Sequence, residues 1–305
     1  MTDISVINLK GTDYALADTA GRASIAEVVR EAEYDRQHST GTYAERDLAS
    51  VFATEIKAKG NDPWAWLQSR AKAGNYDGIR IGDYLQVTTT GSKDVAVQTN
   101  RMLVAGLDTY HQVGDQGDGL GHHVVMLPQD CWGAKGTHAA GAQSGCIMWN
   151  LTNTNQGTST EKRPYLASNL HQWETDCLLP ALPQACRNVL LNHRMLLEER
   201  YSGSGSLNDS TNYSWADLGK IWSPSETEVY GQCVWGTNGW SVGADRPLPL
   251  FENHVKNANT RASFWLRSVS SASASAVCYR SCNGNASHND ATSTWVRARS
   301  GFLVG

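Results

Sequence analysis

Histidine and aspartate side chains in the first half of the chain are of types that bind metal ions. His122 and His123 stand side by side, and Asp115 and Asp118 lie just before them in the glycine-rich stretch Gly114–Gly119. Adjacent residues of a strand point to opposite faces, so two neighbouring histidines rarely bind the same ion. The stretch also lacks the regular acidic ladder and the terminal glutamate of an EF-hand. We therefore expect a tight surface loop and no metal site.

Cysteine is the second residue type that could carry chemistry. Seven are present, but Cys278 and Cys282 have no partner pair at zinc spacing, and His288 does not complete such a site. An odd number of cysteines without a signal peptide predicts reduced thiols in a protein made in the cytosol. The chain also lacks a Gly-x-Ser-x-Gly elbow, a phosphate-binding glycine loop and a His-Glu-x-x-His sequence. These patterns do not support an enzyme, and we expect no catalytic residue and no cofactor.

Composition places the chain among soluble globular proteins of low charge density, because 40% of its 305 residues are hydrophobic and 18% are charged. The formal charge of −4 gives no general attraction to nucleic acid or to an anionic membrane surface. No apolar run of about 18 residues is present, so we expect no membrane insertion. Residues 1–5 lack the basic and apolar regions of a signal peptide, so none is expected.

Tryptophan is concentrated in the second part of the chain, where nine of the eleven lie after residue 130. This predicts a core of large aromatic plates joined by long irregular loops. Two C-terminal segments, Arg261–Ser268 and Trp295–Gly305, carry large apolar groups beside arginines, which we expect to pack over tryptophans. Residues 269–294 between them are mostly small or polar. A stiff frame around such a stretch indicates a display surface rather than a catalytic pocket.

The first 75 residues predict a separate, mainly helical region. We expect one helix capped by Asp18, a second from about Tyr43 to Lys59, and a shorter third helix opened by Pro63. Two or three helices cannot bury all their apolar faces by themselves. They should therefore pack against the larger domain, against copies of themselves or against another protein.

From residue 76 onward the pattern changes to strands. Strands are expected at 79–87, 101–107, 122–128 and 195–201. Helices are expected across 165–193, where they include Leu190 and Leu191. Ser225 should open a short helix, with Glu228 placed to complete a capping box. The stretches 202–214 and 235–249 predict loops.

Three segments in this order resemble the C-type lectin-like domains of phages and gut bacteria: Ile221–Gly231, Phe264–Ser268 and Arg297–Val304. Upstream segments fit as well, at Arg80–Tyr84, Val104–Asp108, Met148–Asn150 and Tyr165–Ser168. The resemblance covers about residues 76–305. It implies an α+β protein with a C-type lectin-like fold and long irregular loops, preceded by the small helical region 1–75. Val296-Arg297-Ala298-Arg299 departs from the Gly-Val-Arg-Pro sequence usual at the last strand.

The same fold is shared by the formylglycine-generating enzymes and by the variable proteins of diversity-generating retroelements. The variable proteins carry their ligand-binding residues after a Trp-x-Arg-Ser segment, which implies a ligand-display surface at 269–295 here. Trp222, Trp265 and Arg267 would be its framework. The copper-binding cysteine pair of the enzymes is not reproduced by Cys278 and Cys282, so their oxidase activity is not transferred. The expected ligand contacts are Tyr279, Arg280, Asn283, Asn285, His288, Asn289 and Trp295.

The segment Ile7–Ile25 resembles the start of many phage tail and head fibre proteins. It implies that residues 1–75 anchor the chain to other virion proteins and that the chain forms a homo-oligomer, by that resemblance a trimer. We therefore expect a phage virion structural protein whose display surface binds a host-surface or mucosal glycan or protein. Two alternatives remain, a purely structural capsid or tail assembly protein and an oxidase of the formylglycine-generating type.

Overall fold

The computed structural model describes residues 6–9, 12–15, 26, 28–29, 45–203, 212–237, 247–253 and 261–305. The chain forms two compact units, Met1–Glu45 and Arg46–Gly305, each considered by itself. In the smaller unit, β1 (Val6–Leu9) and β2 (Thr12–Ala15) form an antiparallel hairpin. Most of the helix expected after Asp18, and most of the segment 7–25, lies outside the described residues.

The larger unit begins at Arg46 and not at residue 76. It contains α2 (Leu48–Val51), α3 (Ala53–Ala58) and α4 (Pro63–Lys72). Trp66 and Leu67 of α4 are fully buried, and the ring of Trp64 packs edge-on against Phe302 at 5.9 Å. These helices are too short to bury their apolar sides alone, so they join the common core instead of forming a separate N-terminal region.

Helix boundaries in this segment follow local signals only in part. Asp62 caps α4 through its carboxylate, which accepts hydrogen bonds from two backbone amides, and Pro63 occupies the first turn as expected. The single helix expected at 43–59 is interrupted instead at Phe52, whose backbone leaves the helical region (φ −109°, ψ 28°).

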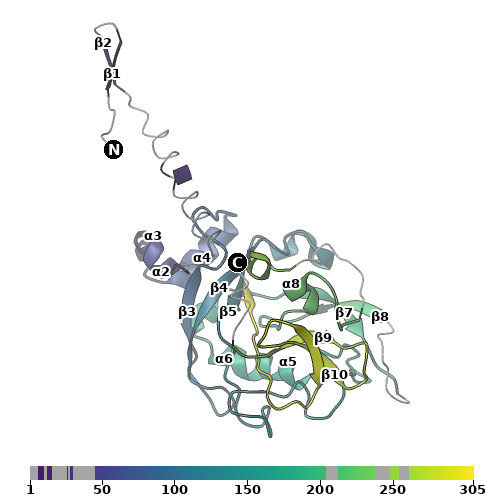
Figure 1. The fold of residues 1–305 in the computed structure, drawn as a ribbon. Coiled ribbons are helices and arrows are strands. Elements are labelled where there is room, and N and C mark those ends of the chain that lie inside the picture. Colours follow the sequence, from purple (N-terminus) through teal and green to yellow (C-terminus); the bar gives the residue numbers. More distant parts are fainter. Residues whose placement is uncertain are drawn as a thin grey trace. The chain divides into compact units, whose positions relative to one another are not determined.

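A five-stranded antiparallel sheet forms the centre of the larger unit, in the order β3-β4-β5-β12-β6. Its strands are β3 (Tyr84–Thr88), β4 (Thr99–Leu107), β5 (Val124–Pro128), β6 (Leu190–Leu191) and β12 (Phe302–Val304). The last strand of the chain pairs with both β5 and β6, and every residue of β5 and β12 is buried. Figure 1 shows the C-terminus beside β4 and β5. The C-terminal segment is therefore part of the core.

Short helices lie between the strands of this sheet in the chain. They are the 3₁₀-helix η1 (Gly114–Leu120), α5 (Asn169–Trp173), the π-helix η2 (Glu174–Leu178), α6 (Leu179–Ala181) and α7 (Gln184–Arg187). The expectation that Leu190 and Leu191 continue a helix is wrong, because these residues pair with β12. The described part of the chain contains no helix long and apolar enough to cross a membrane.

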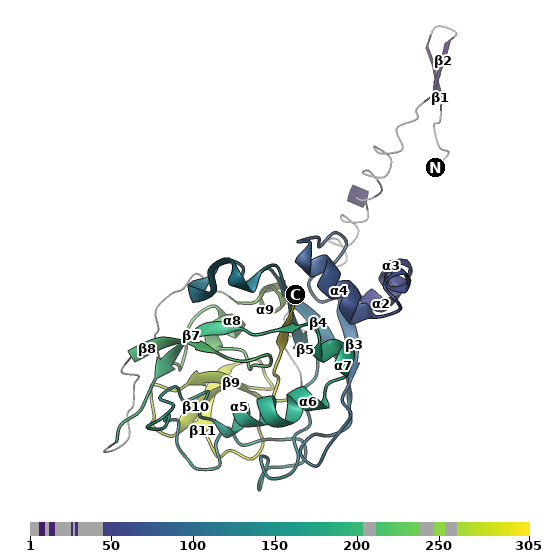
Figure 2. The ribbon, with the colours of Figure 1, turned by 180° about the vertical axis from the view of Figure 1, so that it is seen from behind.

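A second β region contains residues 269–295, the segment expected to form a display surface. The hairpin of β7 (Arg194–Glu199) and β8 (Asn212–Asp217) lies near a three-stranded antiparallel sheet in the order β11-β10-β9. This sheet consists of β9 (Phe264–Val269), β10 (Ala276–Arg280) and β11 (Ala286–Asp290). It lies apart from β3 and close to β7 (Figure 2). The expected strand at 195–201 is confirmed, whereas β8 begins inside the stretch expected as a loop.

Two further helices, α8 (Glu226–Tyr230) and α9 (Pro249–Asn253), complete the described elements. The capping box of α8 is confirmed: Ser225 Oγ accepts the amide of Glu228, and the Glu228 carboxylate accepts the amide of Ser225. Gly231 ends the helix in the left-handed conformation at φ 77°. Helices and sheets coexist in one core, so the fold is α+β.

Ser225→Ala is expected to lower the free energy of unfolding by about 1 kcal/mol, because the Glu228 amide loses its acceptor at the start of α8. Urea unfolding followed by far-UV circular dichroism measures the change. Ser50→Ala is the matched control, since the Ser50 hydroxyl bonds Asp47 at an exposed site. An equal loss in both variants would show that the capping box contributes nothing beyond a surface hydrogen bond.

Candidate functional site

The segment expected to form the display surface, residues 269–295, contains a β-hairpin. Strands β10 and β11 pair antiparallel, with Cys278 opposite His288 and Tyr279 opposite Ser287. The connecting turn is closed by a hydrogen bond from the Ser281 amide to the carbonyl of Asn285 (2.9 Å). Because β11 pairs only with β10, it forms the edge of its sheet and is the most accessible strand of the three.

Arg280, expected as a ligand contact, is a framework residue. Its side chain is buried at 2% exposure, and its guanidinium lies over the ring of Phe264 at 5.7 Å. Burial lowers the pKa of Arg280 from its ordinary value. Arg280 is the register partner of Phe264 on β9, whose ring its guanidinium covers, so its charge is not open at the surface.

One exposed aromatic group lies where the hairpin meets the loop after α8. The indole of Trp235 stacks on the imidazole of His288, with ring centroids 4.2 Å apart and planes inclined by 10°. At its edge the imidazole is fixed by a 2.7 Å hydrogen bond between Nδ1 and the hydroxyl of Ser270. Trp235 is 38% exposed. We call Trp235 and His288 the aromatic platform.

A second aromatic group lies on the opposite face of the hairpin, because Tyr279 and His288 have opposite positions in the strand alternation. The rings of Tyr279 and Trp295 meet edge to face at 5.1 Å, and Tyr279 packs in turn against the buried Trp265 at 6.1 Å. Trp295 is 38% exposed, the same as Trp235.

The remaining expected contacts do not join the two aromatic groups into one patch. Asn283 and Asn285 are exposed on the turn at the tip of the hairpin. Asn289 is half-buried, and its side-chain oxygen accepts the amide of Asp290 (2.8 Å). The seven expected residues thus divide among one buried position, two faces and a turn.

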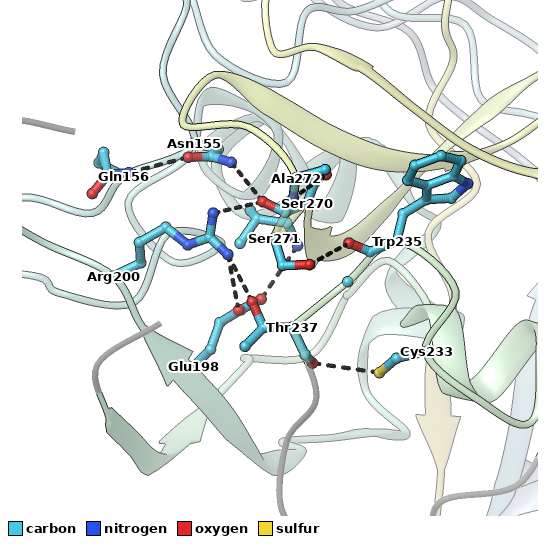
Figure 3. Close-up of polar contacts among 12 residues, drawn as sticks. Asn155, Gln156, Glu198, Arg200, Cys233, Trp235, Thr237, Ser270, Ser271 and Ala272 are labelled. Carbon is cyan, nitrogen blue, oxygen red and sulfur yellow. Dashed lines mark hydrogen bonds and ion pairs between the residues drawn. The ribbon is translucent and has the colours of Figure 1, made fainter. Parts of the chain in front are cut away.

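Buried polar residues hold the loop between β9 and β10 beneath the platform, as Figure 3 shows. The side-chain amide of Asn155 donates to the carbonyls of Ser270, Ser273 and Ala276, at 3.3, 2.7 and 2.7 Å. The Arg200 guanidinium also donates to the Ser270 carbonyl (2.6 Å). Asn155 and Arg200 are both fully buried. The loop backbone is therefore anchored from inside the protein.

The charge of Arg200 is met by neighbouring acceptors on the same side of the loop. One guanidinium nitrogen donates to the hydroxyl of Thr237 at 2.7 Å, and the Glu198 carboxylate lies 3.7 Å away. Glu198 in turn accepts the amide of Val269 at 3.2 Å. These contacts connect β7, the loop after α8 and the end of β9 into one polar cluster (Figure 3).

Trp235 itself was missed by the sequence analysis, which grouped the tryptophans as core plates and placed this one in a loop. Its amide donates to the buried carboxylate of Glu226 at 3.1 Å, and its carbonyl accepts the amide of Ser271 at 2.9 Å. Glu226 also accepts the amides of Val234 and Gly236, both at 2.8 Å. A sequence signal for this loop is the pair of glycines, Gly231 and Gly236, around Gln232-Cys233-Val234-Trp235.

The framework behind the hairpin contains a buried ion pair. Arg267 donates to both oxygens of the Glu228 carboxylate, at 2.6 and 2.8 Å, and the Tyr110 hydroxyl donates to it at 2.7 Å. Burial alone raises the pKa of Glu228, but the Arg267 charge and the hydrogen bonds outweigh it and hold that pKa below its ordinary value. Trp222 and Trp265, expected as framework, are fully buried.

The cysteine and histidine pairs considered for metal binding lie in different surroundings. Cys278 is buried, which raises the pKa of its thiol, whereas Cys282 is exposed; both thiols are free. His122 bonds the Asp108 carboxylate, while His123 is buried and accepts the amide of Tyr110. Within the ranges that the structure describes, no three His, Cys, Asp or Glu side chains gather as a metal site.

A family model described as a domain of unknown function (DUF6273) matches residues 144–300, about half of the chain. The chain therefore belongs to the DUF6273 family. Comparison with curated proteins and with solved structures found no match. The matched range includes the hairpin, the aromatic platform, Asn155, Arg200 and the Glu228–Arg267 pair. The site described above is thus part of the family domain rather than an addition to it.

Proposed function

We propose that the larger unit is a ligand-display module with a C-type lectin-like fold, which binds its ligand through the β10–β11 hairpin and the loop around Trp235. The observation that carries the proposal is the presence of exposed aromatic rings on both faces of an edge hairpin, Trp235 on one and Trp295 on the other. Aromatic side chains supply large contact areas at little conformational cost, which is why they dominate binding surfaces.

Rigid support is the second argument for a binding role. The loop backbone beneath the platform is held by the buried Asn155 and Arg200, and β9 is held by the Arg267–Glu228 pair. A surface that is already ordered loses less entropy when a ligand binds. Burying polar groups costs free energy unless all of them find hydrogen-bond partners. A display function would explain why this loop is held by such groups.

For the biological setting we propose a phage virion, on the strength of the sequence resemblances. The region at the start of the chain would attach to other virion proteins, and the module would meet a host-surface or mucosal glycan or protein. Several copies on one particle would raise the avidity of a weak site without any new contact. The trimer expected from the fibre resemblance would supply such copies.

The double variant Tyr279→Ala, Asn285→Ala tests the display function. We expect binding to immobilised mucin or to bacterial cell surfaces to fall at least about tenfold, because an aromatic contact and a tip amide are lost together. Val97→Ala is the control, since Val97 is 70% exposed on the connection between β3 and β4. Circular dichroism and thermal unfolding verify that the fold is kept.

Two other outcomes would assign a different function to the protein. If replacement of the whole stretch 269–295 changes no binding but prevents incorporation into particles, the hairpin mediates assembly. If the protein binds copper and shows thiol-dependent oxidase activity, it is an enzyme of the formylglycine-generating type. Either outcome would overturn the display function.

A further inference from the structure

Trp235 is exposed and yet fixed on several sides. Scattered exposed apolar residues are normal on protein surfaces and by themselves mean nothing. This side chain differs because its indole nitrogen donates to the Ala286 carbonyl (3.3 Å), one ring face lies on His288, and its backbone is held by Glu226 and Ser271. With one face and the nitrogen edge engaged, the opposite ring face supplies the exposed surface.

The edge of β11 beside the platform is poorly suited to receive another strand. The Ser281 amide bonds the Asn285 carbonyl, and the Ala291 amide bonds the Ser275 carbonyl. In an antiparallel pair, the intervening residues 286, 288 and 290 therefore turn their backbone groups away from β10. Two of these outward groups are already used, the Ala286 carbonyl by Trp235 and the Asp290 amide by the Asn289 side chain. A peptide strand would have to displace both.

The described side chains beside the Trp235 ring are small or neutral. They are its chain neighbour Val234, the hydroxyl of Ser271, which bonds the Trp235 carbonyl, and the half-buried imidazole of His288 on the engaged ring face. Glu226 and Arg200 are fully buried and engaged with the loop backbone, and the partly buried Glu198 accepts the amide of Val269. The described part of this surface therefore offers a flat aromatic face beside small polar and apolar groups, while these three charged side chains are engaged within the protein.

We infer that the aromatic platform binds a neutral pyranose ring, whose C–H face lies on the exposed face of the Trp235 indole and whose rim of hydroxyls reaches the Ser271 hydroxyl. A sugar ring has one flat apolar face and a polar rim, which matches this arrangement of groups. The indole and the imidazole are stacked beforehand, so little ordering is needed when the sugar arrives. The inference rests on the proposed display function and names its ligand class and its main contact.

The experiment is an array of immobilised neutral glycans built from hexoses and N-acetylhexosamines, followed by calorimetric titration of the best binder. We expect Trp235→Ala to weaken that binding at least about tenfold. Val97→Ala is the control, because it removes a 70% exposed apolar side chain on the connection between β3 and β4, outside the proposed binding surface. It should change the affinity by less than about twofold.

A second measurement uses the unmodified protein, so its result does not depend on whether a variant folds. Bound oligosaccharide should slow the chemical oxidation of Trp235 by N-bromosuccinimide, measured by peptide mass spectrometry, more strongly than it slows the oxidation of Trp295. Equal protection of both residues, or of neither, would overturn the inference, as would the absence of binding to any neutral glycan of the array.

The outcome separates this inference from the display function. If the Tyr279, Asn285 double variant loses cell-surface binding while Trp235→Ala keeps it, the platform is not the contact and the display function stands. Binding that is competed by an apolar peptide and not by a neutral oligosaccharide would likewise reject the sugar. If the double variant and Trp235→Ala both retain full binding, both proposals fail.

Discussion

Arg267→Met is expected to lower the free energy of unfolding by about 3–5 kcal/mol, the largest effect of any substitution proposed for this chain. Methionine fills similar space, but it leaves the carboxylate of Glu228 buried without its bidentate partner. The Tyr110 hydroxyl and the Ser225 amide still bond that carboxylate, yet they carry no positive charge. Chemical unfolding in urea at neutral pH, with circular dichroism and tryptophan fluorescence as probes, measures the loss.

The change of the free energy of unfolding with pH tests the same ion pair. In the folded protein the pKa of Glu228 lies below its ordinary value of 4.5. Its contribution to stability is therefore complete above about pH 4.5 and is lost as the pH falls through the folded-state pKa. In Arg267→Met, burial without the cation should raise the pKa of Glu228 instead. The variant should thus become more stable as the pH is lowered from 7 to about 5.

A double-mutant cycle with Glu228→Gln provides the control. Glutamine keeps the shape of the side chain and removes the charge that Arg267→Met leaves unpaired. We expect the double variant to be more stable than the sum of the two single losses predicts, by about 1–3 kcal/mol. Strictly additive losses, or no difference in pH dependence between the parent protein and Arg267→Met, would contradict a functioning ion pair.

Asn155→Ala is expected to be the second most damaging substitution, with a loss of about 3 kcal/mol. The amide of Asn155 is the shared donor for the carbonyls of Ser270, Ser273 and Ala276. Alanine leaves these carbonyls without that donor, although Arg200 still bonds Ser270. Because Ser270 also fixes the His288 imidazole, the aromatic platform should loosen together with the loop.

Hydrogen exchange measures this effect locally. We expect faster amide exchange in residues 270–276 and weaker ligand binding. Exchange in the five-stranded sheet should match that of the parent protein once the difference in global stability between the two proteins is taken into account. Asn283→Ala is the control, because Asn283 is exposed on the turn of the hairpin. If Asn155→Ala slows or leaves unchanged the exchange of the loop, the buried amide does not hold the platform.

Elements specified by neighbouring residues were predictable from the sequence. Asp62 and Pro63 mark the start of α4, and Ser225 with Glu228 marks the start of α8, since capping needs only residues within one turn. Continuous apolar runs located β4 and β5 for the same reason. Trp222 and Trp265, expected as framework residues from the resemblance, are fully buried.

Positions decided by distant partners were not predictable in this way. Leu190 and Leu191 form a strand because β12 lies beside them, more than a hundred residues later in the chain. Helix α4 belongs to the larger unit because Trp64 meets Phe302. Arg280 looks like a surface cation in the sequence and is buried because β10 turns it toward Phe264.

The sequence by itself determined that the C-terminal region is a polar stretch between aromatic and arginine-rich segments, and that this region is the candidate binding surface. Only the tertiary structure brought Trp235 onto His288 and placed Asn155 and Arg200 beneath the loop. These residues lie far from their partners along the chain. The sequence around a tryptophan in a loop, or around a single asparagine, does not indicate which distant residue it will contact. The strand pairing of β9, β10 and β11 sets which of these side chains meet, and pairing is a property of the folded chain.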